Sequence, residues 1–317
     1  MNNPKPKVLI IDDMHESVIS LLEEKGFEAH YKPTVSAKEV PALLAGYEVL
    51  FLRSKMTVTD EVLAQANKLK VIGRAGAGLD LIDLEAVRRR NIQLVHASEG
   101  NRDAVAEHAL GMLLCLFNNL LRADRQVRQK RWLREENRGV ELGEKTVGIV
   151  GYGYMGQAFA KRLAGFGCRI IAYDIEKKDF GDALVEEVSL EQLQQEADVV
   201  SFHIPLNQHN KGLVNTAYLQ AFRKNIYLIN TARGEILPLQ DLVQALESGK
   251  VTAAALDVLE NEKLHQLSPM QQENFNYLIT SENVLLSPHV AGWTHESYKK
   301  INQVLVRKLV DVYSRIS

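Results

Sequence analysis

The chain has 317 residues, of which 46% are hydrophobic and 25% are charged. This composition is ordinary for a globular protein, and the length allows two domains of about 100–200 residues each. The formal net charge of −2 at pH 7 gives no reason to expect a nucleic acid or an anionic membrane as a partner. The cysteines, Cys115 and Cys168, lack C-x-x-C spacing, so we expect free thiols in a reducing compartment.

We expect neither a targeting signal nor a membrane-spanning segment. The first apolar run, Val8–Ile11, ends at two acidic residues, Asp12 and Asp13. The most apolar stretch, Ala109–Phe117, is far shorter than the roughly 20 residues that a helix needs to span a bilayer. We therefore expect a cytoplasmic protein with no membrane partner.

The N-terminal part of the chain alternates between short apolar runs and helical patterns. The runs predicted to be strands are Val8–Ile11, Phe27–Tyr31, Val49–Leu52, Leu69–Gly73 and Ile92–His96. Such an alternation predicts a parallel, doubly wound sheet. Asp12 and Asp13 after the first strand resemble the acidic pocket of a phosphorelay receiver. That fold needs an aspartate after the third strand, where Arg53 stands, so we reject this interpretation.

A long helix is predicted from Asp103 to about Arg131. Its first half, Ala104–Phe117, is almost wholly apolar, so we expect it to be buried between two domains. Its second half is strongly basic, which we interpret as a solvated face.

From Thr146 onward a second alternation of strands and helices runs to the end of the chain. The predicted strands are Val147–Val150, Ile170–Tyr173, Val199–Phe202, Ile226–Ile229, Val251–Leu256 and Val284–Leu286. Polar residues gather where these strands end, at Gly151, Asp174, His203, Thr231 to Arg233, Asp257 and His289. Because ligands of open α/β sheets bind outside the carboxyl ends of the strands, this pattern predicts one shared site.

The first of these strands leads into the sequence G-Y-G-Y-M-G, from Gly151 to Gly156. Its glycines suit a tight turn, a close approach of backbone N–H groups to a pyrophosphate, and close helix–strand packing. A helix expected to begin near Tyr154 would direct the positive end of its dipole at that phosphate. Asp174 ends the next strand and can accept hydrogen bonds from a ribose 2′-hydroxyl, which favours NAD over NADP.

Two alternatives concern the cofactor and a metal. Lys177 and Lys178 follow Asp174 and leave NADP open. His203 and His209 could be a pair of metal ligands, but no carboxylate or cysteine has the spacing of further ligands. We therefore expect no metal.

Three side chains are candidates for chemistry. Arg233, in the sequence N-T-A-R-G, follows a predicted strand and can bind a carboxylate through two hydrogen bonds. His289 titrates near neutral pH, so it can take a hydroxyl proton as hydride leaves the same carbon. Glu262 is its candidate partner, because a carboxylate beside an imidazole favours the charged form and raises its pKa.

With these residues identified, the chain resembles the D-isomer-specific 2-hydroxyacid dehydrogenase family over nearly its whole length, and most of all its D-3-phosphoglycerate dehydrogenases. The motifs that carry the resemblance are Arg53-Ser54, G-R-A-G-A-G-L-D from Gly73, A-V-A-E from Ala104, the glycine turn, H-I-P-L from His203, N-T-A-R-G, A-L-D-V from Ala255 and P-H-V-A-G-W-T from Pro288. The resemblance covers the catalytic part only, so no regulatory domain is expected.

The resemblance implies an α/β protein with two doubly wound parallel-sheet domains. Residues 1–98 and 290–317 would form a flavodoxin-like substrate-binding domain, and residues 99–289 an NAD-binding Rossmann domain. The family's catalytic set corresponds here to Arg233, which would bind the substrate carboxylate, and to His289 as acid–base, oriented by Glu262.

The resemblance also implies the binding residues. Those expected to bind NAD are Gly151, Gly153, Tyr154, Met155, Gly156, Asp174, His203, Pro205, Thr231, Ala232, Asp257 and Gly292. Those expected to bind the substrate are Arg53, Ser54, Arg74, Ala75, Gly76, Ala77, Gly78 and Asn101. Arg53 and Arg74, with Lys55 close by, would suit a phosphate, although solvated surface charge is an equally good interpretation.

The hypothesis is therefore an NAD-dependent oxidoreductase that interconverts a D-2-hydroxy acid, possibly 3-phosphoglycerate, and its 2-keto acid. The family resemblance implies a homodimer, with the helical region after Asn101 contributing to the contact. The alternative is an NAD(H)-sensing binding protein, like the C-terminal-binding corepressors that resemble the same family, with little or no turnover.

Overall fold

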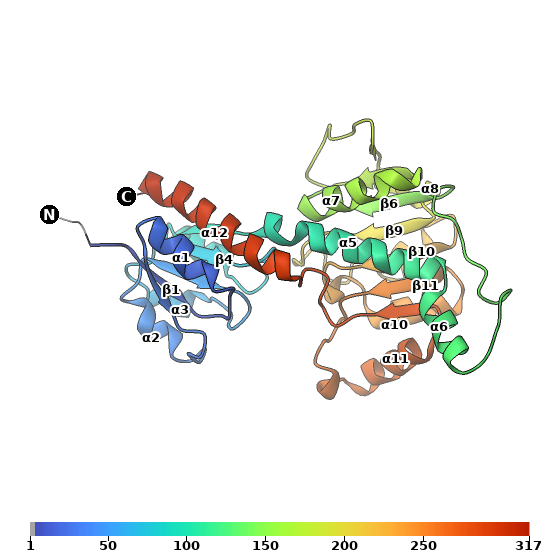
Figure 1. Cartoon of the computed structure of the whole chain (residues 1–317), viewed down its shortest axis with the longest axis horizontal. Helices are drawn as coiled ribbons and strands as arrows, with labels where there is room; N and C mark the ends of the chain where they lie inside the picture. The colour runs from blue at the N-terminus through green and yellow to red at the C-terminus, as the bar shows by residue number, and fades with distance from the viewer. Residues whose placement is uncertain (1–3, 317) are drawn as a thin grey trace. The chain divides into compact units, whose positions relative to one another are not determined.

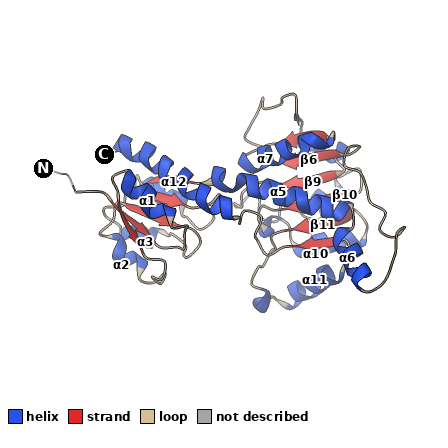
Figure 2. Cartoon of the chain, in the orientation of Figure 1, coloured by secondary structure: helices blue, strands red, loops and turns tan. Residues whose placement is uncertain are grey.

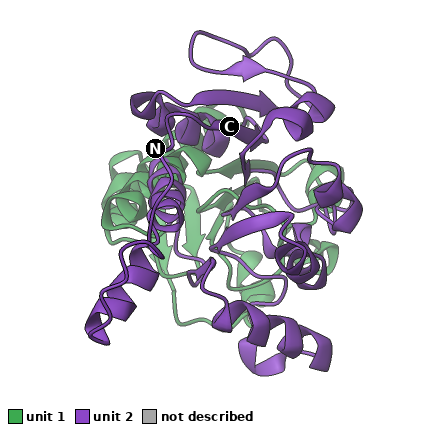
Figure 3. Cartoon of the chain, turned by 90° about the vertical axis from the view of Figure 1, so that its right-hand side faces the viewer, with its two compact units in different colours: residues 1–102, 293–317 green, residues 103–292 purple. Residues whose placement is uncertain are grey.

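The structure is a computed structural model that describes residues 4–316 (Figure 1). Helices and strands alternate along the chain, as the colouring by secondary structure shows (Figure 2). The chain divides into two compact units: unit 1 holds residues up to Arg102 and from Trp293 onward, and unit 2 holds Asp103–Gly292 (Figure 3). This division does not test whether the first part binds substrate and the second binds NAD, so both functions remain predictions.

Unit 1 contains a five-stranded sheet in the order β2-β1-β3-β4-β5, and every pairing in it is parallel. The strands are β1 (Lys7–Ile10), β2 (Glu28–Tyr31), β3 (Val49–Leu52), β4 (Val71–Arg74) and β5 (Gln93–His96). The helices are α1 (Ser17–Glu24), α2 (Val40–Leu44), α3 (Asp60–Ala64), α4 (Leu84–Arg89) and α12 (His295–Ile316). Each apolar run predicted to be a strand in this part of the chain therefore overlaps a strand of the structure, with ends that differ by up to two residues.

Both faces of this sheet are covered, as a doubly wound fold requires. One core cluster joins Val8 and Phe51 of the sheet to Leu305 and Leu309 of α12. The other lies on the opposite face, under α2, α3 and α4. The C-terminal amphipathic segment thus packs on the N-terminal sheet.

Unit 2 contains a seven-stranded parallel sheet in the order β12-β11-β10-β9-β6-β7-β8. Its strands are β6 (Thr146–Val150), β7 (Arg169–Tyr173), β8 (Glu186–Glu187), β9 (Val199–Phe202), β10 (Ile226–Asn230), β11 (Val251–Leu256) and β12 (Val284–Leu286). Its helices are most of α5 (Ser98–Phe117), α6 (Leu120–Arg128), α7 (Tyr154–Leu163), α8 (Leu190–Glu196), α9 (Thr216–Gln220), α10 (Leu239–Glu247) and α11 (Pro269–Thr280). The predicted fold class, two doubly wound parallel sheets, is confirmed.

The predicted continuous helix from Asp103 to Arg131 is wrong. The structure has α5 (Ser98–Phe117) and α6 (Leu120–Arg128), bent by 58° at the break between them. Asn119 has a left-handed φ of +51°, a conformation that asparagine tolerates better than most residues. The side chain of Asn118 donates to the carbonyl of Leu114 at 3.0 Å. The backbone N–H of Asn118 also donates to this carbonyl, at 3.1 Å, so both bonds from Asn118 hold the last turn of α5.

The apolar part of α5 contributes Ala106, Ala109, Leu113 and Phe117 to a core cluster of unit 2, where they meet residues of β6 and α7. Among residues 4–316, no single helix combines the length and apolarity needed to cross a bilayer. The bent pair of α5 and α6 does meet those two criteria, which the core helix of a folded domain can also meet.

Candidate active site

The glycine turn after β6 has the backbone that its sequence predicts. Gly151 has a φ of +93°, and a Cβ there would lie 2.7 Å from the carbonyl oxygen of His203. A Cβ on Gly156 would lie 2.2 Å from the carbonyl oxygen of Gly151, so this glycine permits the close helix–strand packing. A Cβ on Gly153 would meet nothing within 4 Å. Gly153 stands directly before α7, so open space faces the N-terminus of that helix.

Asp174 follows β7 and is bound to the glycine turn. One carboxylate oxygen accepts from the backbone N–H of Tyr152 at 2.7 Å, and the other accepts from those of Glu176 and Lys177 at 2.9 Å. Burial raises the pKa of Asp174, but these backbone donors outweigh it and hold the pKa below its ordinary value. Asp174 is therefore a fixed anion at the carboxyl end of the sheet.

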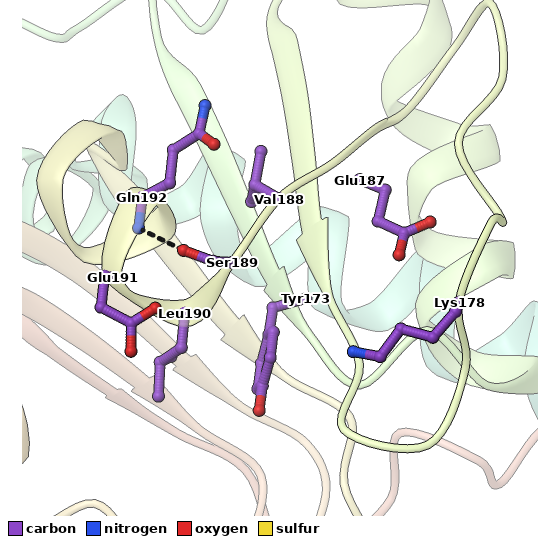
Figure 4. Close-up of a pocket in the computed structure, with 8 residues that line it drawn as sticks. All are labelled: Tyr173, Lys178, Glu187, Val188, Ser189, Leu190, Glu191 and Gln192. Carbon is purple, nitrogen blue, oxygen red and sulfur yellow. Dashed lines mark hydrogen bonds between the residues drawn. The ribbon is translucent and has the colours of Figure 1, made fainter.

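A pocket of about 470 Å³ lies next to Asp174 along the chain. It is lined by Tyr173, Lys178 and the segment from Glu187 to Gln192 (Figure 4). The backbone N–H of Gly151 donates to the carbonyl of Tyr173 at 2.8 Å, so the strand that bounds the pocket also contacts the glycine turn. Tyr173 thus links the pocket to the turn.

Other residues predicted to bind the cofactor lie at strand ends of the same sheet. Tyr154 is exposed and Met155 half-buried at the start of α7, and Pro205 is exposed after β9. The buried hydroxyl oxygen of Thr231 has no hydrogen-bond partner among the described residues. The ring of His203, unlike the hydroxyl of Thr231, has a partner within the protein, because its Nε2 lies 2.9 Å from the hydroxyl of Ser201. Burial lowers the pKa of His203 to about 4. His203 is thus a neutral ring.

Arg233 follows β10 in a turn held by Asn230. The side chain of Asn230 accepts from the backbone N–H of Ala232 and donates to the carbonyl of Arg233, both at 3.0 Å. Gly234 comes next, and a Cβ there would lie 1.9 Å from the carbonyl carbon and oxygen of Leu259. The turn that carries Arg233 therefore touches the backbone of the segment that leads to Glu262.

His289 and Glu262 form the pair that the sequence suggested. The Nδ1 atom of His289 lies 2.8 Å and 3.0 Å from the two carboxylate oxygens of Glu262. The hydrogen bond to Glu262 raises the pKa of His289 above its ordinary value, burial and the charge of Arg233 lower it, and the net shift is upward. Arg233 is thus close enough for its charge to act on the imidazole. The structure brings all three candidate catalytic residues together within unit 2.

Asp257 has a different environment from the one expected of a cofactor ligand. Its side chain is 1% exposed, and its oxygens accept from the hydroxyl of Ser287 at 2.6 Å and the backbone N–H groups of Val290 and Ala291 at 2.9 and 2.8 Å. The backbone N–H of His289 donates to the carbonyl of Asp257 at 2.7 Å. Asp257 therefore holds the loop that carries His289.

The residues expected to bind substrate all lie in unit 1. The backbone N–H groups of Ala75 and Gly76 donate to the carbonyls of Leu52 and Arg74, so these two amides are already used. Among the described residues, those of Ala77 and Gly78 have no such backbone acceptor. The side-chain oxygen of Asn101 is buried and has no hydrogen-bond partner among residues 4–316.

All three cations suggested for a phosphate donate to backbone carbonyls, and of these bonds the one from Arg53 to Asp13 is the longest, at 3.4 Å. The ammonium of Lys55 donates to the carbonyls of Pro33 and Val35. The Arg74 guanidinium donates to the carbonyl of Ala75 at 2.8 Å. Arg53 is half-buried and Ser54 is exposed at the end of β3. Of the three, Arg53 therefore has the surroundings that best suit an anion.

Residues 110–291 match the family described as D-isomer specific 2-hydroxyacid dehydrogenase, NAD binding domain. The chain belongs to this family. The matched residues lie within unit 2, whose glycine turn, fixed Asp174 and Thr231 hydroxyl without a hydrogen-bond partner among the described residues fit such a cofactor.

Individual relatives extend this similarity to nearly the whole chain. A D-3-phosphoglycerate dehydrogenase of Methanocaldococcus jannaschii is 34% identical over 311 residues, which are 96% of this chain and 57% of that protein. The chain thus spans little more than half the length of that relative. A hydroxypyruvate reductase of Thermotoga maritima is 32% identical over 96% of this chain and 97% of its own length.

Among solved structures, a D-lactate dehydrogenase of Aquifex aeolicus in complex with NAD and lactic acid matches with a TM-score of 0.82. It is 25% identical, and the match covers 98% of this chain and 95% of that one. This family member has the same two-sheet architecture.

Sequence reasoning missed several residues that shape the site of this dehydrogenase-family chain. Ser287 links Asp257 to His108, whose Nε2 lies 3.0 Å from the Ser287 hydroxyl. His108 stands in α5, more than 100 residues before Asp257 and Ser287 in the sequence, so only the folded chain reveals this contact. The segment 264–280 contains helix α11, which the sequence analysis did not predict. Its signal was present, because Ser268, Pro269 and Gln271 form a capping box with proline at the first position.

Proposed function

We propose that this protein is an NAD-dependent oxidoreductase that interconverts a D-2-hydroxy acid and its 2-keto acid. The observation that carries the proposal is the contact of 2.8 Å between His289 and Glu262, with Arg233 near enough for its charge to lower the pKa of that imidazole. A carboxylate-binding cation beside a carboxylate-oriented imidazole suits a small 2-hydroxy acid.

Each side chain has a separate role in this proposal. Arg233 binds the substrate carboxylate and so orients the carbon that carries the hydroxyl. Because Glu262 occupies Nδ1 of His289, Nε2 is the atom left to take the hydroxyl proton. A bound NAD would supply the hydride acceptor for that same carbon, so that loss of the hydroxyl proton to His289 and of the hydride would give the 2-keto acid.

The raised pKa of His289 favours the direction that consumes a proton. Below this pKa the imidazolium can give its proton to the keto oxygen, so reduction is fast at lower pH and slows as pH rises through the pKa. Oxidation of the hydroxy acid needs the neutral imidazole and has the opposite dependence.

For the cofactor, we propose that the glycine turn and the start of α7 bind the pyrophosphate and that Asp174 binds the ribose. The adjacent pocket, lined by Tyr173 and Leu190 among others, would hold the adenine. Thr231, Ala232 and Gly292 would lie toward the nicotinamide. Unit 1 would supply the substrate-binding residues, including Asn101 and the amides of Ala77 and Gly78.

The substrate class follows from the relatives' names. Reductases of hydroxypyruvate and dehydrogenases of 3-phosphoglycerate both act at a carbon next to a carboxylate. We propose a three-carbon 2-keto acid of this type, with 3-phosphoglycerate and its keto acid as the first pair to test. A corepressor-like NAD(H) sensor is not favoured, because the catalytic set of Arg233, Glu262 and His289 is complete.

The deciding experiment measures NADH oxidation with phosphohydroxypyruvate, hydroxypyruvate, glyoxylate and pyruvate. At least one should be reduced, and His289→Asn should lower that kcat by about 10²–10⁴, the usual contribution of a general acid or base. Calorimetry should show unchanged NADH binding by this variant. Tight NADH binding without turnover of any keto acid would support the sensor instead, and full activity of His289→Asn would refute the assignment of the acid–base.

We also propose a homodimer in which α6 and the segment after it contribute to the contact. Leu121 and Trp132 are 62% and 77% exposed, which is unusual for large apolar side chains on one short segment. Sedimentation should give twice the chain mass for the wild type. Leu121→Glu combined with Trp132→Ala should give monomers, whereas Phe166→Ala, another exposed aromatic, should not change the mass. A monomeric wild type would contradict the proposal.

The two cysteines support a cytoplasmic location, which we propose as well. Cys115 and Cys168 are free thiols in the structure, as expected in a reducing compartment. Fractionation of cells that make the protein would test the location.

A further inference from the structure

Arg53 lies against two aromatic rings in unit 1. Its guanidinium carbon is 4.0 Å from the centroid of the Trp293 ring and 5.5 Å from that of the Tyr298 ring. The two rings are themselves 5.5 Å apart. A guanidinium over an aromatic face gains cation–π attraction and loses rotational freedom. The rings therefore restrict Arg53 to few orientations.

The carboxylates near Arg53 are committed to other donors. The Asp13 carboxylate accepts from the hydroxyls of Tyr31 at 3.0 Å and Tyr298 at 2.6 Å. Asp12 accepts from the backbone N–H of Arg53 at 2.6 Å. Among residues 4–316, Arg53 has no ion pair with a carboxylate, and its Nη1 reaches only the backbone oxygen of Asp13, at a long 3.4 Å. A hydrogen bond to Tyr298 and the charges of Asp12 and Asp13 also act on the guanidinium, but these partners are fewer than its five N–H donors.

Partial burial of a guanidinium without an ion pair costs free energy, and a bound anion offsets that cost. Burial lowers the pKa of Arg53, which reflects that cost. Its planar fork suits two hydrogen bonds to a phosphate or a carboxylate. Lys55, the neighbouring cation, donates to the carbonyls of Pro33 and Val35 and is not available in the same way.

The backbone around Trp293 is held in place by the start of α12. Thr294 and Ser297 exchange hydrogen bonds of 3.0 Å between each one's backbone N–H and the other's hydroxyl, as in the capping of a helix N-terminus. These bonds fix the backbone next to Trp293 within unit 1.

We propose that Trp293 and Tyr298 are positioning residues that hold Arg53 in the orientation in which it binds a second anionic group of the substrate. The inference rests on the proposed dehydrogenase function and narrows it to 2-keto acids with two anionic groups. Tyr298 acts on Arg53 with its ring, and its hydroxyl keeps the Asp13 carboxylate from pairing with the guanidinium. Trp293 acts through the face of its indole.

The test compares phosphohydroxypyruvate with hydroxypyruvate, two substrates that differ only in the phosphate. For Trp293→Ala, kcat/KM should fall about tenfold or more with phosphohydroxypyruvate, mainly through KM, and by less than about threefold with hydroxypyruvate. Arg53→Gln should show the same selective loss. Trp293→Ala added to Arg53→Gln should cause no further loss of preference, because the indole acts through the guanidinium.

Conservative variants guard against a general loss of structure. Trp293→Phe keeps a ring and should restore part of the preference. Tyr298→Phe keeps the ring but frees Asp13, so it should also weaken the phosphorylated substrate selectively. Phe166→Ala, which removes an exposed aromatic of unit 2, should leave both substrates unchanged. Thermal unfolding of each variant identifies any that does not fold, and then Trp293→Phe and Tyr298→Phe decide the question.

The outcomes separate this inference from the proposed function. Equal losses for both substrates in Trp293→Ala, or a wild type that reduces hydroxypyruvate but not phosphohydroxypyruvate, would overturn the inference and leave the dehydrogenase standing. A wild type that reduces no 2-keto acid would overturn both.

Discussion

Gly234 is the point where the segments that carry Arg233 and Glu262 meet, so its replacement by alanine tests the proposed site. A Cβ at this position would lie 1.9 Å from the carbonyl carbon and oxygen of Leu259 and 2.5 Å from the nitrogen of Glu260. These are backbone atoms, which cannot rotate away as a side chain can. Arg233 precedes the glycine, and Glu262 follows the contacted backbone by two residues.

The expected cost can be worked out from this geometry. Ordinary contacts begin at 3.4 Å, so the two segments must separate by about 1.5 Å in Gly234→Ala. Overpacking a close-packed site costs about 1–3 kcal/mol, and we expect the upper end because no side chain can yield. A displacement of about 1 Å between catalytic groups costs on the order of 100-fold in rate. We therefore expect kcat/KM to fall about 100-fold and the free energy of unfolding to fall by about 3 kcal/mol.

Urea unfolding and steady-state NADH oxidation measure the two effects. The matched control is Gly111→Ala, an exposed glycine within α5 whose added Cβ would meet nothing within 4 Å. It should keep full activity and gain about 0.5–1 kcal/mol, because alanine is the better helix former. Wild-type kinetics and stability in Gly234→Ala would show that the segments of Arg233 and Glu262 do not depend on this contact.

Three further predictions concern charges in unit 2. Glu262→Gln removes the carboxylate that raises the pKa of His289, so kcat/KM for keto-acid reduction should begin to fall at a lower pH than in the wild type; an unchanged pH profile would contradict the pairing. In Asp257→Asn a buried backbone N–H of the His289 loop faces the amide nitrogen and loses its acceptor, so the free energy of unfolding should fall by about 1–3 kcal/mol. A melting curve equal to that of the wild type would argue that Asp257 does not hold this loop. Asp174→Asn should weaken NAD binding about tenfold through the loss of a charge-assisted acceptor, which calorimetry can measure, and an unaltered Kd would show that Asp174 does not contact the ribose.

The strands were predictable because each is a short apolar run between turn signals, and tertiary packing then buries it. The break between α5 and α6 was not, because Asn118 and Asn119 lie in a segment whose apolar pattern continues on both sides. Asparagine can remain helical or adopt a left-handed φ, and only the packing of the following segment decides. Helix α11 was missed because its polar composition gives no apolar helical pattern, although a capping box at Ser268 marks its start.

The site was predictable in part. Arg233, Glu262 and His289 were identified by motif, and their chemistry suited a 2-hydroxy acid, but no spacing in the sequence could show that Glu262 reaches His289. Loops from different strands meet only when the sheet order is known. The role of Asp257 was beyond prediction, since its carboxylate had to be buried and surrounded by donors before it became a support for the loop.

The hydrogen bonds of Asp257 explain how His289 keeps an unfavourable backbone conformation. His289 has a left-handed φ of +53°, a conformation that costs a non-glycine residue about 1–3 kcal/mol and persists only where its surroundings over-determine it. The Asp257 side chain accepts three hydrogen bonds from residues that flank His289, and its carbonyl accepts a fourth from His289 itself. Hydrogen bonds to a charged group contribute about 1.5–3 kcal/mol each, so the three to the carboxylate exceed the strain. The imidazole is thus held facing Glu262 before any ligand binds, and the buried charge at Asp257 is stabilised by the loop that it holds.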